Sequence, residues 1–414
     1  MKKLFFISIC SAAIIPSRAQ TVSSPYSIIG IGDIEQRNVS KYAGMASVSI
    51  AQRSPFYINT FNPASLTAMP KHMVLFEING KGRTASFRVP GTDTATSSTK
   101  DFTAKRISFA YKVSEKTAFS FGLQPYSSVN YSFSSIQKLG ADADAYLRTV
   151  TGSGGLNQAY ISLARQLTKQ FSVGVTSSYL FGSLNQKVNY YNSGLGLDIT
   201  QDNNVYLRNF NFTGGLQYES SPEKKVQHRF GATATLPVNM LRSQSYKILE
   251  AGTDVTTEQI TNTQPYNLPL KAGFGYSATF NKTVSLSADY TFQNWKNSTT
   301  PIANTSIIPS QRVAVGVEYG SIKKLDNYAF EKYFLQAGVF YENTYLKVAG
   351  NQLKDYGFTL GGGFNLGRIN VYGAYELGRK GNYKLQQIAE NYSQFSLGIT
   401  FKDIWEKSRY ARYQ

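Results

Sequence analysis

The feature that most constrains this chain is a short-range alternation of apolar and polar residues that never lengthens into an apolar block. After residue 19, no apolar run approaches the roughly 20 residues that a membrane-spanning helix needs, although 42% of the 414 residues are hydrophobic. Apolar residues instead occupy every second position in segments such as 270–280, 283–292, 312–319 and 394–401. A period of two indicates β-strands with one apolar face. We therefore predict an all-β protein, although a soluble sandwich would alternate in the same way.

Residues 1–19 have the order of features that defines a secretory signal peptide. Lys2 and Lys3 provide the positive start, residues 4–15 the apolar stretch, and Ser17-Arg18-Ala19 a cleavage site with small residues at its first and third positions. A buried first helix or strand would not require this order. Removal of the segment lowers the formal net charge of the chain from +18 to +15.

Cys10 is the single cysteine and lies inside the predicted signal peptide. The exported chain would then contain no thiol, which excludes disulfides, cysteine metal sites and cysteine nucleophiles. Charged residues make up 16% of the chain, against about 25% in soluble proteins, while aromatic residues reach 14%. These properties leave two classes, a soluble periplasmic or secreted β protein and an outer-membrane β-barrel.

The lengths of the connections between predicted strands favour the barrel. Short turns and long polar segments alternate along the chain, and residues 321–332 form the one longer member of the short class. This alternation is typical of outer-membrane barrels, which have tight periplasmic turns and longer external loops. We predict a barrel of about 14 antiparallel strands over residues 71–401, ending on Phe401. The short turns are predicted at 114–116, 168–170, 220–225, 281–282 and 367–368, and the long segments at 91–104, 136–155, 192–204, 237–267, 296–310, 347–354 and 380–391.

Residues 20–70 do not alternate like strands. They contain small residues and turn formers, including the Gly30-Ile31-Gly32-Asp33 turn and the sequence Phe61-Asn62-Pro63-Ala64-Ser65. We predict that they form a compact hatch inside the barrel, and a flexible periplasmic arm is the alternative. Residues 402–414 are predicted to be a basic periplasmic tail.

Several motifs in these regions resemble the FadL-type outer-membrane transporters of long-chain fatty acids and other hydrophobic compounds. The resemblance rests on residues 44–49, on Asn62-Pro63-Ala64-Ser65-Leu66, on Gly122-Leu123-Gln124-Pro125-Tyr126 in the predicted third strand, and on the closing strand that ends at Phe401. The predicted strand number also matches that family. The chain departs from the family pattern with Ser65, where Gly is commoner, and with its basic tail.

The resemblance implies a way in which a hydrophobic ligand would leave the barrel. In FadL-type proteins an N-terminal hatch blocks the lumen, and a kink in the third strand opens the wall sideways toward the lipid. Here the hatch residues would be Gly44, Ser47, Asn62, Pro63 and Ala64. The kink would lie at Gly122 and Pro125, because proline lacks the N–H group that a strand ladder requires. A proline near the rim of a strand is the alternative for Pro125.

The residues alone give little sign of enzymatic chemistry. His72 and His228 are the two histidines and neither lies at metal-ligand spacing, so a serine hydrolase acting on lipid could use only one of them. We predict no catalytic residue, no metal site and no cofactor. Four charged residues fall on the polar faces of their strands and are predicted to face the lumen, namely Asp289, Glu318, Glu342 and Lys271. They would either form a charge network around the hatch or be solvated by water at the lumen wall. The long external segments offer apolar residues for ligand capture, namely Tyr146, Leu147, Leu241, Ile248 and Leu249.

The predicted function is passive transport of a fatty-acid-like hydrophobic molecule, released sideways through the wall of an outer-membrane barrel. The alternative is a barrel that transports nothing and serves as a partner in an outer-membrane complex, such as the type IX secretion system. Lys and Arg are scattered over turns and loops, without a basic helix or stacking motif. The expected partners are therefore outer-membrane lipid, a hydrophobic ligand and another outer-membrane or periplasmic protein, and not nucleic acid.

Overall fold

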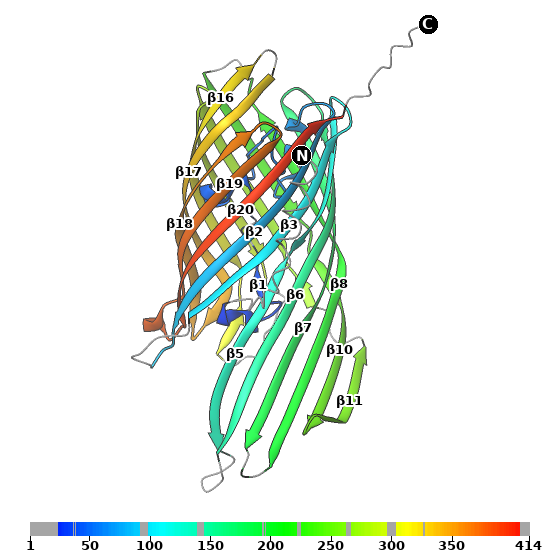
Figure 1. Cartoon of the computed structure of the whole chain (residues 1–414), viewed down its shortest axis with the longest axis vertical. Coiled ribbons are helices and arrows are strands. Elements are labelled where there is room, and N and C mark those ends of the chain that lie inside the picture. The colour runs from blue at the N-terminus through cyan, green and yellow to red at the C-terminus, as the bar shows by residue number, and fades with distance from the viewer. Residues whose placement is uncertain are drawn as a thin grey trace, which may run out of the picture.

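The computed structural model describes residues 24–35, 37, 39–91, 98–138, 145–192, 194, 196–221, 225–261, 266–295, 304–325 and 328–405, with the backbone alone at 98–101, 197, 259–261 and 322–330. The predicted signal peptide and residues 406–414 of the predicted tail lie outside these ranges. A closed antiparallel barrel of 14 strands forms the body of the protein (Figure 1). The prediction of a 14-stranded outer-membrane barrel is therefore confirmed. No helix in the described part of the chain is long and apolar enough to cross a membrane.

The barrel closes where its last strand pairs with its first, in a ladder from Met73–Ile404 to Arg88–Ala389. Four wall strands are interrupted and consist of two or three shorter ones. In chain order the wall contains β2 (Met73–Arg88), β3 (Ser98–Lys112), β4 (Thr117–Pro125) with β5 (Ser127–Lys138), β6 (Ala145–Gln166), β7 (Phe171–Asn192), β8 (Leu197–Glu219), β9 (Val226–Thr235) with β10 (Val238–Glu250), β11 (Thr253–Thr261) with β12 (Tyr266–Leu268) and β13 (Leu270–Phe280), β14 (Val284–Asn294), β15 (Thr305–Ile307) with β16 (Ser310–Leu325), β17 (Tyr328–Val348), β18 (Asn351–Leu366), β19 (Ile369–Lys380) and β20 (Ala389–Ile404).

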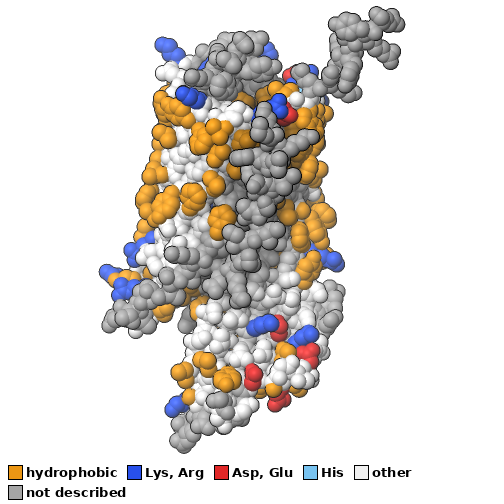
Figure 2. Space-filling view, in the orientation of Figure 1, with side chains coloured by type: hydrophobic (Ala, Val, Ile, Leu, Met, Phe, Trp, Pro, Cys, Tyr) orange, Lys and Arg blue, Asp and Glu red, His pale blue; other side chains and the backbone are white. Residues whose placement is uncertain are grey.

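The alternation in the sequence becomes an apolar outer face and a small or polar inner face. On β13, Phe274 and Tyr276 are exposed on the outside, whereas Ser277 faces inward and is fully buried. Figure 2 shows apolar side chains over the upper two thirds of the barrel, where they form the surface that contacts lipid. A strand with one face in lipid and one in the lumen never needs a long apolar run. The protein is thus an outer-membrane barrel.

The external side of the barrel is taller than predicted. β5, β6, β7, β8, β10 and β11 continue well beyond the other strands (lower part of Figure 1), and this extension is largely polar on the face shown in Figure 2. Residues 237–267, predicted as a loop, mostly form β10, β11 and β12, and most of the predicted segment 136–155 belongs to β5 and β6. These strands lie beyond the lipid, so they lack the apolar outer face that marks a strand in the sequence.

The N-terminal segment lies inside the ring of strands. It contains η1 (Pro25–Ile28), β1 (Asp33–Ile34), η2 (Lys41–Met45) and η3 (Pro63–Ala68). Tyr26, Ile29 and Ile31 of this segment are buried and fill the lumen against inward-facing apolar residues of the wall. That wall surface consists of Leu156, Leu180, Leu207, Met240, Leu268, Trp295, Ile307, Tyr345, Leu346 and Leu353. A further short helix, η4 (Tyr383–Leu385), lies in the connection from β19 to β20.

The last strand also extends beyond its predicted end at Phe401. β20 continues to Ile404, so Lys402 belongs to the wall and not to a tail. Trp405 then contacts Phe109 and Tyr111 of β3, with ring centroids 6.3 and 6.2 Å apart. Aromatic residues of this kind are typical of the boundary between lipid and water. The rim with the short turns and the chain end faces the periplasm by the same rule.

Candidate functional site

The wall of the barrel is not fully hydrogen-bonded between its second and third strands. β3 pairs with β4 only from Ile107–Leu123 to Lys112–Ala118. Beyond that step β3 continues toward Ser98 along β2, and β5 continues along β6. No ladder joins β3 to β5 in the described part of the chain, and Figure 1 shows β5 turned away from β3 with β1 visible between them. We call this opening the wall gap.

The gap begins where the predicted kink residues lie. β4 ends at Pro125 and β5 begins at Ser127, while both strands pair with β6. The break reverses which side chains face the lumen. Leu123 and Tyr131 would lie on the same face of an unbroken strand, but Leu123 is exposed on the outside and Tyr131 is buried inside. Gly122 lies near the last paired step, where an added Cβ would be 2.9 Å from the hydroxyl oxygen of Tyr160. Gly122 therefore allows close packing at the end of the ladder.

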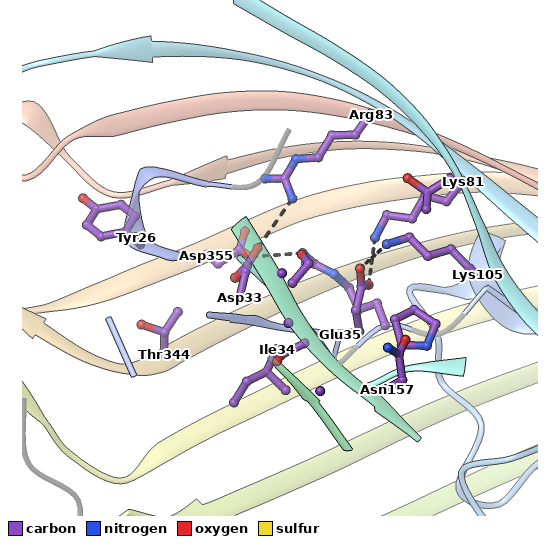
Figure 3. A pocket seen from close by; sticks show the side chains of 18 of the residues that line it. Tyr26, Asp33, Ile34, Glu35, Lys81, Arg83, Lys105, Asn157, Thr344 and Asp355 are labelled. Carbon is purple, nitrogen blue, oxygen red and sulfur yellow. Dashed lines mark hydrogen bonds and ion pairs between the residues drawn. The ribbon is translucent and has the colours of Figure 1, made fainter. Parts of the chain in front are cut away.

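Three consecutive residues of the N-terminal segment connect the two sides of the wall gap. Asp33 and Ile34 pair with Ser128 and Ser127 of β5. The next residue, Glu35, accepts hydrogen bonds from Lys105 of β3 at 2.5 Å and from Lys81 of β2 at 3.2 Å. Figure 3 shows both lysines pointing toward Glu35. We call residues 33–35 the strap.

The acidic groups of the strap are held ionised by the basic residues around them. Burial raises the pKa of Glu35, but the adjacent Lys105 and Lys81 outweigh it and leave the pKa well below its usual range. Asp33 is 2.8 Å from Lys380 and 3.7 Å from Arg83. These two cations likewise outweigh burial and lower the pKa of Asp33. Opposite charges at this distance favour the charged form of a carboxyl group.

A cavity of about 460 Å³ lies behind the gap and is lined by both of its edges. Its walls include Lys105 of β3, Ser127 of β5 and the charged groups of the strap (Figure 3). Arg37 extends the charged network, at 3.1 Å from Asp355 and 3.5 Å from Glu376. Burying an apolar molecule here would separate charges from their partners or from water, which is unfavourable. The cavity suits polar groups better than a hydrocarbon.

The residues predicted for the hatch contact the inner wall at glycines. A Cβ added to Gly44 would lie 2.6 Å from the Cα atom of Gly361 on β18. A Cβ on Gly174 of β7 would lie 2.6 Å from the amide nitrogen of Ala64 and 2.7 Å from the carbonyl carbon of Pro63. The absence of side chains at these wall positions therefore lets the backbone of the N-terminal segment approach the strands directly.

The other two predicted hatch residues shape the segment itself. Asn62 caps η3 by accepting a hydrogen bond from the amide of Ala64 at 3.1 Å. Its side-chain amide donates to the carbonyl of Ile50 at 2.8 Å and to that of Leu216 on β8 at 3.0 Å. Ser47 has a left-handed backbone (φ 59°) and follows η2. Asn62 thus joins two parts of the segment to the wall.

Among the four charged residues predicted to face the lumen, Asp289 and Glu318 contact the N-terminal segment. Asp289 accepts hydrogen bonds from the amides of Ser49 at 2.7 Å and Ile50 at 3.0 Å. Glu318 lies 3.2 Å from Lys41. Glu342 lies 3.9 Å from Arg312 of the wall and interacts electrostatically with Arg37 of the N-terminal segment. Lys271 is on an inward-facing position of β13. Asp289 and Glu318 thus hold the N-terminal segment through specific hydrogen bonds and an ion pair.

The residues predicted to capture ligand lie in strands and do not form one groove. Tyr146 and Leu147 belong to β6, and Leu241, Ile248 and Leu249 belong to β10, with β7 and β8 between the two strands. None of the five lines the cavity behind the gap. Tyr146 donates a hydrogen bond to Gln137 at 3.1 Å and packs against Tyr190.

In the described part of the chain, each of the two histidine rings contacts a tyrosine hydroxyl. His72 contacts the hydroxyl of Tyr111 at 3.3 Å, and His228 contacts that of Tyr276 at 2.8 Å. Within the described ranges, no three His, Cys, Asp or Glu side chains are placed to share a metal ion. The arrangement offers binding surfaces and ion pairs as its chemistry.

The strap and its basic partners carry no motif that identifies them in the sequence. Glu35 had no recognisable motif, and Lys81 and Lys105 are separated from it by 46 and 70 positions. A usable signal was present on β2, where Lys81 and Arg83 occupy inward-facing positions of a strand. Such charges need a partner in the lumen, and the N-terminal segment offers the acidic residues Asp33 and Glu35.

Comparison with solved structures finds barrels of the same fold. The chain is similar to the CymD monoaromatic hydrocarbon channel, with 12% identity, a TM-score of 0.57, and 90% of this chain and 100% of that chain covered. It is similar to a FadL homologue of Pseudomonas aeruginosa, with 13% identity, a TM-score of 0.58 and coverage of 89% and 99%. For the Pseudomonas putida toluene transporter TodX, the values are 14%, 0.58, 91% and 100%.

These similarities confirm the FadL-like fold that the sequence motifs predicted, and at this identity they concern the fold alone. Comparison with curated proteins gives no match. The family model that matches is described as BamG, and it covers residues 1–411. The match spans the predicted signal peptide, the N-terminal segment and the whole barrel. This chain belongs to the BamG family.

Proposed function

We propose that this barrel is a subunit of an outer-membrane protein complex and acts through its wall and external surfaces, without conducting a ligand through its lumen. The observation that carries the proposal is the packing of the N-terminal segment across the lumen, beside the cavity behind the wall gap. Tyr26, Ile29 and Ile31 pack against inward-facing apolar residues of the wall. Nearer the periplasm, η3 fits directly against the wall glycines.

The charges in the lumen support this proposal. Lys41 lies between Glu318 at 3.2 Å and Glu331 at 2.7 Å, so the N-terminal segment is ion-paired to β16 and β17. Removing one partner from a buried ion pair costs about 3–5 kcal/mol. A passage for hydrophobic molecules through this region would have to separate such pairs. The membership of the BamG family, and not of a family named for transport, is consistent with the proposal.

The proposal is tested by extracting the tagged protein from its own outer membrane in mild detergent. We expect it to be recovered in a stoichiometric complex with at least one other outer-membrane protein, a secretion channel among the candidates. A barrel of unrelated family carrying the same tag serves as the control. Recovery of the protein as a single free barrel under conditions that keep other membrane complexes intact would contradict the proposal.

The wall gap favours a second candidate function, passive lateral release of a fatty-acid-like molecule. Residues 24–70 would then act as a hatch that must move, because parts of them pack across the lumen, and ligand would leave beside Pro125. The matched test compares Pro125→Val with Pro237→Val, since Pro237 lies at another interruption of a wall strand, between β9 and β10. Uptake of a labelled fatty acid should fall in the first variant only. Equal uptake in both variants and the wild type would count against transport.

A further inference from the structure

The wall gap leaves one long strand edge open. β5 pairs with β6 along its length, and on its other side it meets only the N-terminal segment among the described residues. There β1 pairs with Ser127 and Ser128. Two positions further, the hydroxyl of Ser27 accepts a hydrogen bond from the amide of Asn130 at 3.2 Å and donates to its carbonyl at 3.3 Å. The N-terminal segment thus already adds itself to the start of this edge.

The contact with Ser27 also shows which backbone N–H and C=O groups of β5 point away from β6. The N–H and C=O of Asn130 point toward Ser27 and hence away from β6. In an antiparallel ladder these directions alternate, so the groups of Ser132, Ser134 and Ile136 point toward the same open edge. In the part of the chain that the structure describes, no residue pairs with them. This edge is therefore a template for another strand.

Proteins normally protect an exposed edge with charges, prolines or bulges. β11, at the other end of the same external sheet, carries Asp254 and Glu258. β5 has no charge and no proline from Ser127 to Gln137, and its first charge is the terminal Lys138. The side chains of Phe133 and Ile136 are 38% and 77% exposed. The two edges of one sheet thus differ in the way expected if a partner covers β5.

We propose that the β5 edge binds an extended segment of a partner polypeptide by strand addition. This proposal rests on the proposed function and names the surface and the kind of partner. The incoming strand would continue from the positions that β1 and Ser27 occupy and pair with Ser132, Ser134 and Ile136. Its main chain would supply the hydrogen bonds. Along one face its side chains would meet the stacked rings of Tyr131 and Phe133, and along the other the polar row that includes Ser132 and Ser134.

Such a partner segment would alternate apolar and polar residues. Its apolar side chains would cover Tyr131 and Phe133 on the inner face of the sheet, where Tyr131 already packs within an apolar cluster. The cavity behind the wall gap reaches Ser127 and Ser128, so there is space beside the start of the edge. The partner is thus defined by its chemistry. It is an extended polypeptide segment whose backbone N–H and C=O groups are unpaired along one side.

The test is backbone amide hydrogen exchange of the full-length protein in isolated native outer membranes and after purification in detergent. We expect the amides of Ser132, Ser134 and Ile136 to exchange at least tenfold more slowly in the native membrane. The edge amides of β11 serve as an internal control and should exchange alike in both states. Equal rates at the β5 edge in the two preparations would overturn the proposal.

A proline substitution on the β5 edge distinguishes strand addition from other causes of amide protection. Ser132→Pro removes an N–H that the ladder with β6 does not use, and Ser132→Ala retains it. We expect loss of protection at Ser134 and Ile136 in the proline variant only. Ser134→Lys, which puts a charge on the edge, provides a second variant if the proline variant does not fold. Unchanged protection in a folded edge variant would overturn the proposal.

Two further measurements complete the experiment, one in lipid vesicles and one that compares hydrogen exchange with the recovery of the complex. Purified protein in lipopolysaccharide vesicles should show no protection at the β5 edge, and protection there would assign the cover to lipid and overturn strand addition. If the protein is recovered in a complex while these amides exchange freely in the native membrane, this inference fails and the proposed function stands. If the protein is recovered as a free barrel, the proposed function itself fails.

Discussion

Glu35 of the N-terminal segment lies 2.5 Å from Lys105 of β3, on the opposite side of the wall gap from the strand with which its neighbours pair. Lys81 shares the same carboxylate at 3.2 Å. One side chain therefore connects the N-terminal segment to two wall strands, while Asp33 and Ile34 connect it to β5 through the backbone. The strap holds the two edges of the gap in a fixed relation.

Replacing Glu35 with Gln should destabilise the barrel. The change leaves Lys81 and Lys105 without their carboxylate in a largely buried site, and we expect a loss of about 3–5 kcal/mol. Thermal unfolding followed by the change in gel mobility of the folded barrel measures the effect. Glu115→Gln is the control, because Glu115 pairs with Lys71 at 3.2 Å on the exposed rim, where such a pair contributes about 0–1 kcal/mol. Equal melting temperatures for the two variants would contradict this account of the strap.

The effect of Glu35→Gln should not depend on pH in the neutral range. The pKa of Glu35 is lower in the folded protein than the value of about 4.3 expected in the unfolded chain. A lowered pKa contributes stability that is fully present above the unfolded value and is lost as pH falls through the folded value. The difference in melting temperature between wild type and variant should therefore be constant from about pH 8 to pH 5 and shrink only in stronger acid. A difference that shrinks between pH 8 and pH 6 would show that another group is responsible.

Two adjacent glycines of β8 should respond differently to substitution. A Cβ on Gly215 would lie 2.8 Å from Cδ of Pro63, whereas a Cβ on Gly214 meets no atom within 4 Å. We expect Gly215→Ala to cost about 1–3 kcal/mol by forcing η3 away from the wall, and Gly214→Ala to be neutral. Thermal unfolding, together with protease cleavage within residues 39–70, distinguishes the two. Similar behaviour of both variants would mean that η3 is not seated on this glycine.

Removing the hydroxyl of Ser27 should raise the hydrogen exchange of the Asn130 amide on the β5 edge. In Ser27→Ala the amide of Asn130 loses its acceptor, so we expect its hydrogen exchange in the purified protein to rise about tenfold, as a lost hydrogen bond of about 1.4 kcal/mol implies. Ser134→Ala is the control, because the hydroxyl of Ser134 lies 3.2 Å from that of Thr149 and does not reach Asn130. No change at Asn130 would show that Ser27 does not cover this edge.

The barrel was predictable because its physical cause is local. A strand between lipid and lumen must alternate, and this pattern is readable in residues 270–280 and 394–401 without any knowledge of their neighbours. The position of Pro125 was also visible in the sequence, since a missing N–H is a property of one residue, and β4 ends there. The external strands were misread as loops because β10 and β11 lie beyond the lipid, where no apolar face is required.

The residues alone were enough to show that the strands alternate, that they close into a barrel of the FadL-like kind, and that several charges face a lumen. Which of these charges meet follows from the three-dimensional arrangement of the strands. Lys81 is separated from Glu35 by 46 positions and Lys380 from Asp33 by 347. Their pairing depends on the register and closure of the barrel, which are set by all strands together. The open edge of β5 was equally invisible, because an edge exists only where a neighbouring strand is absent.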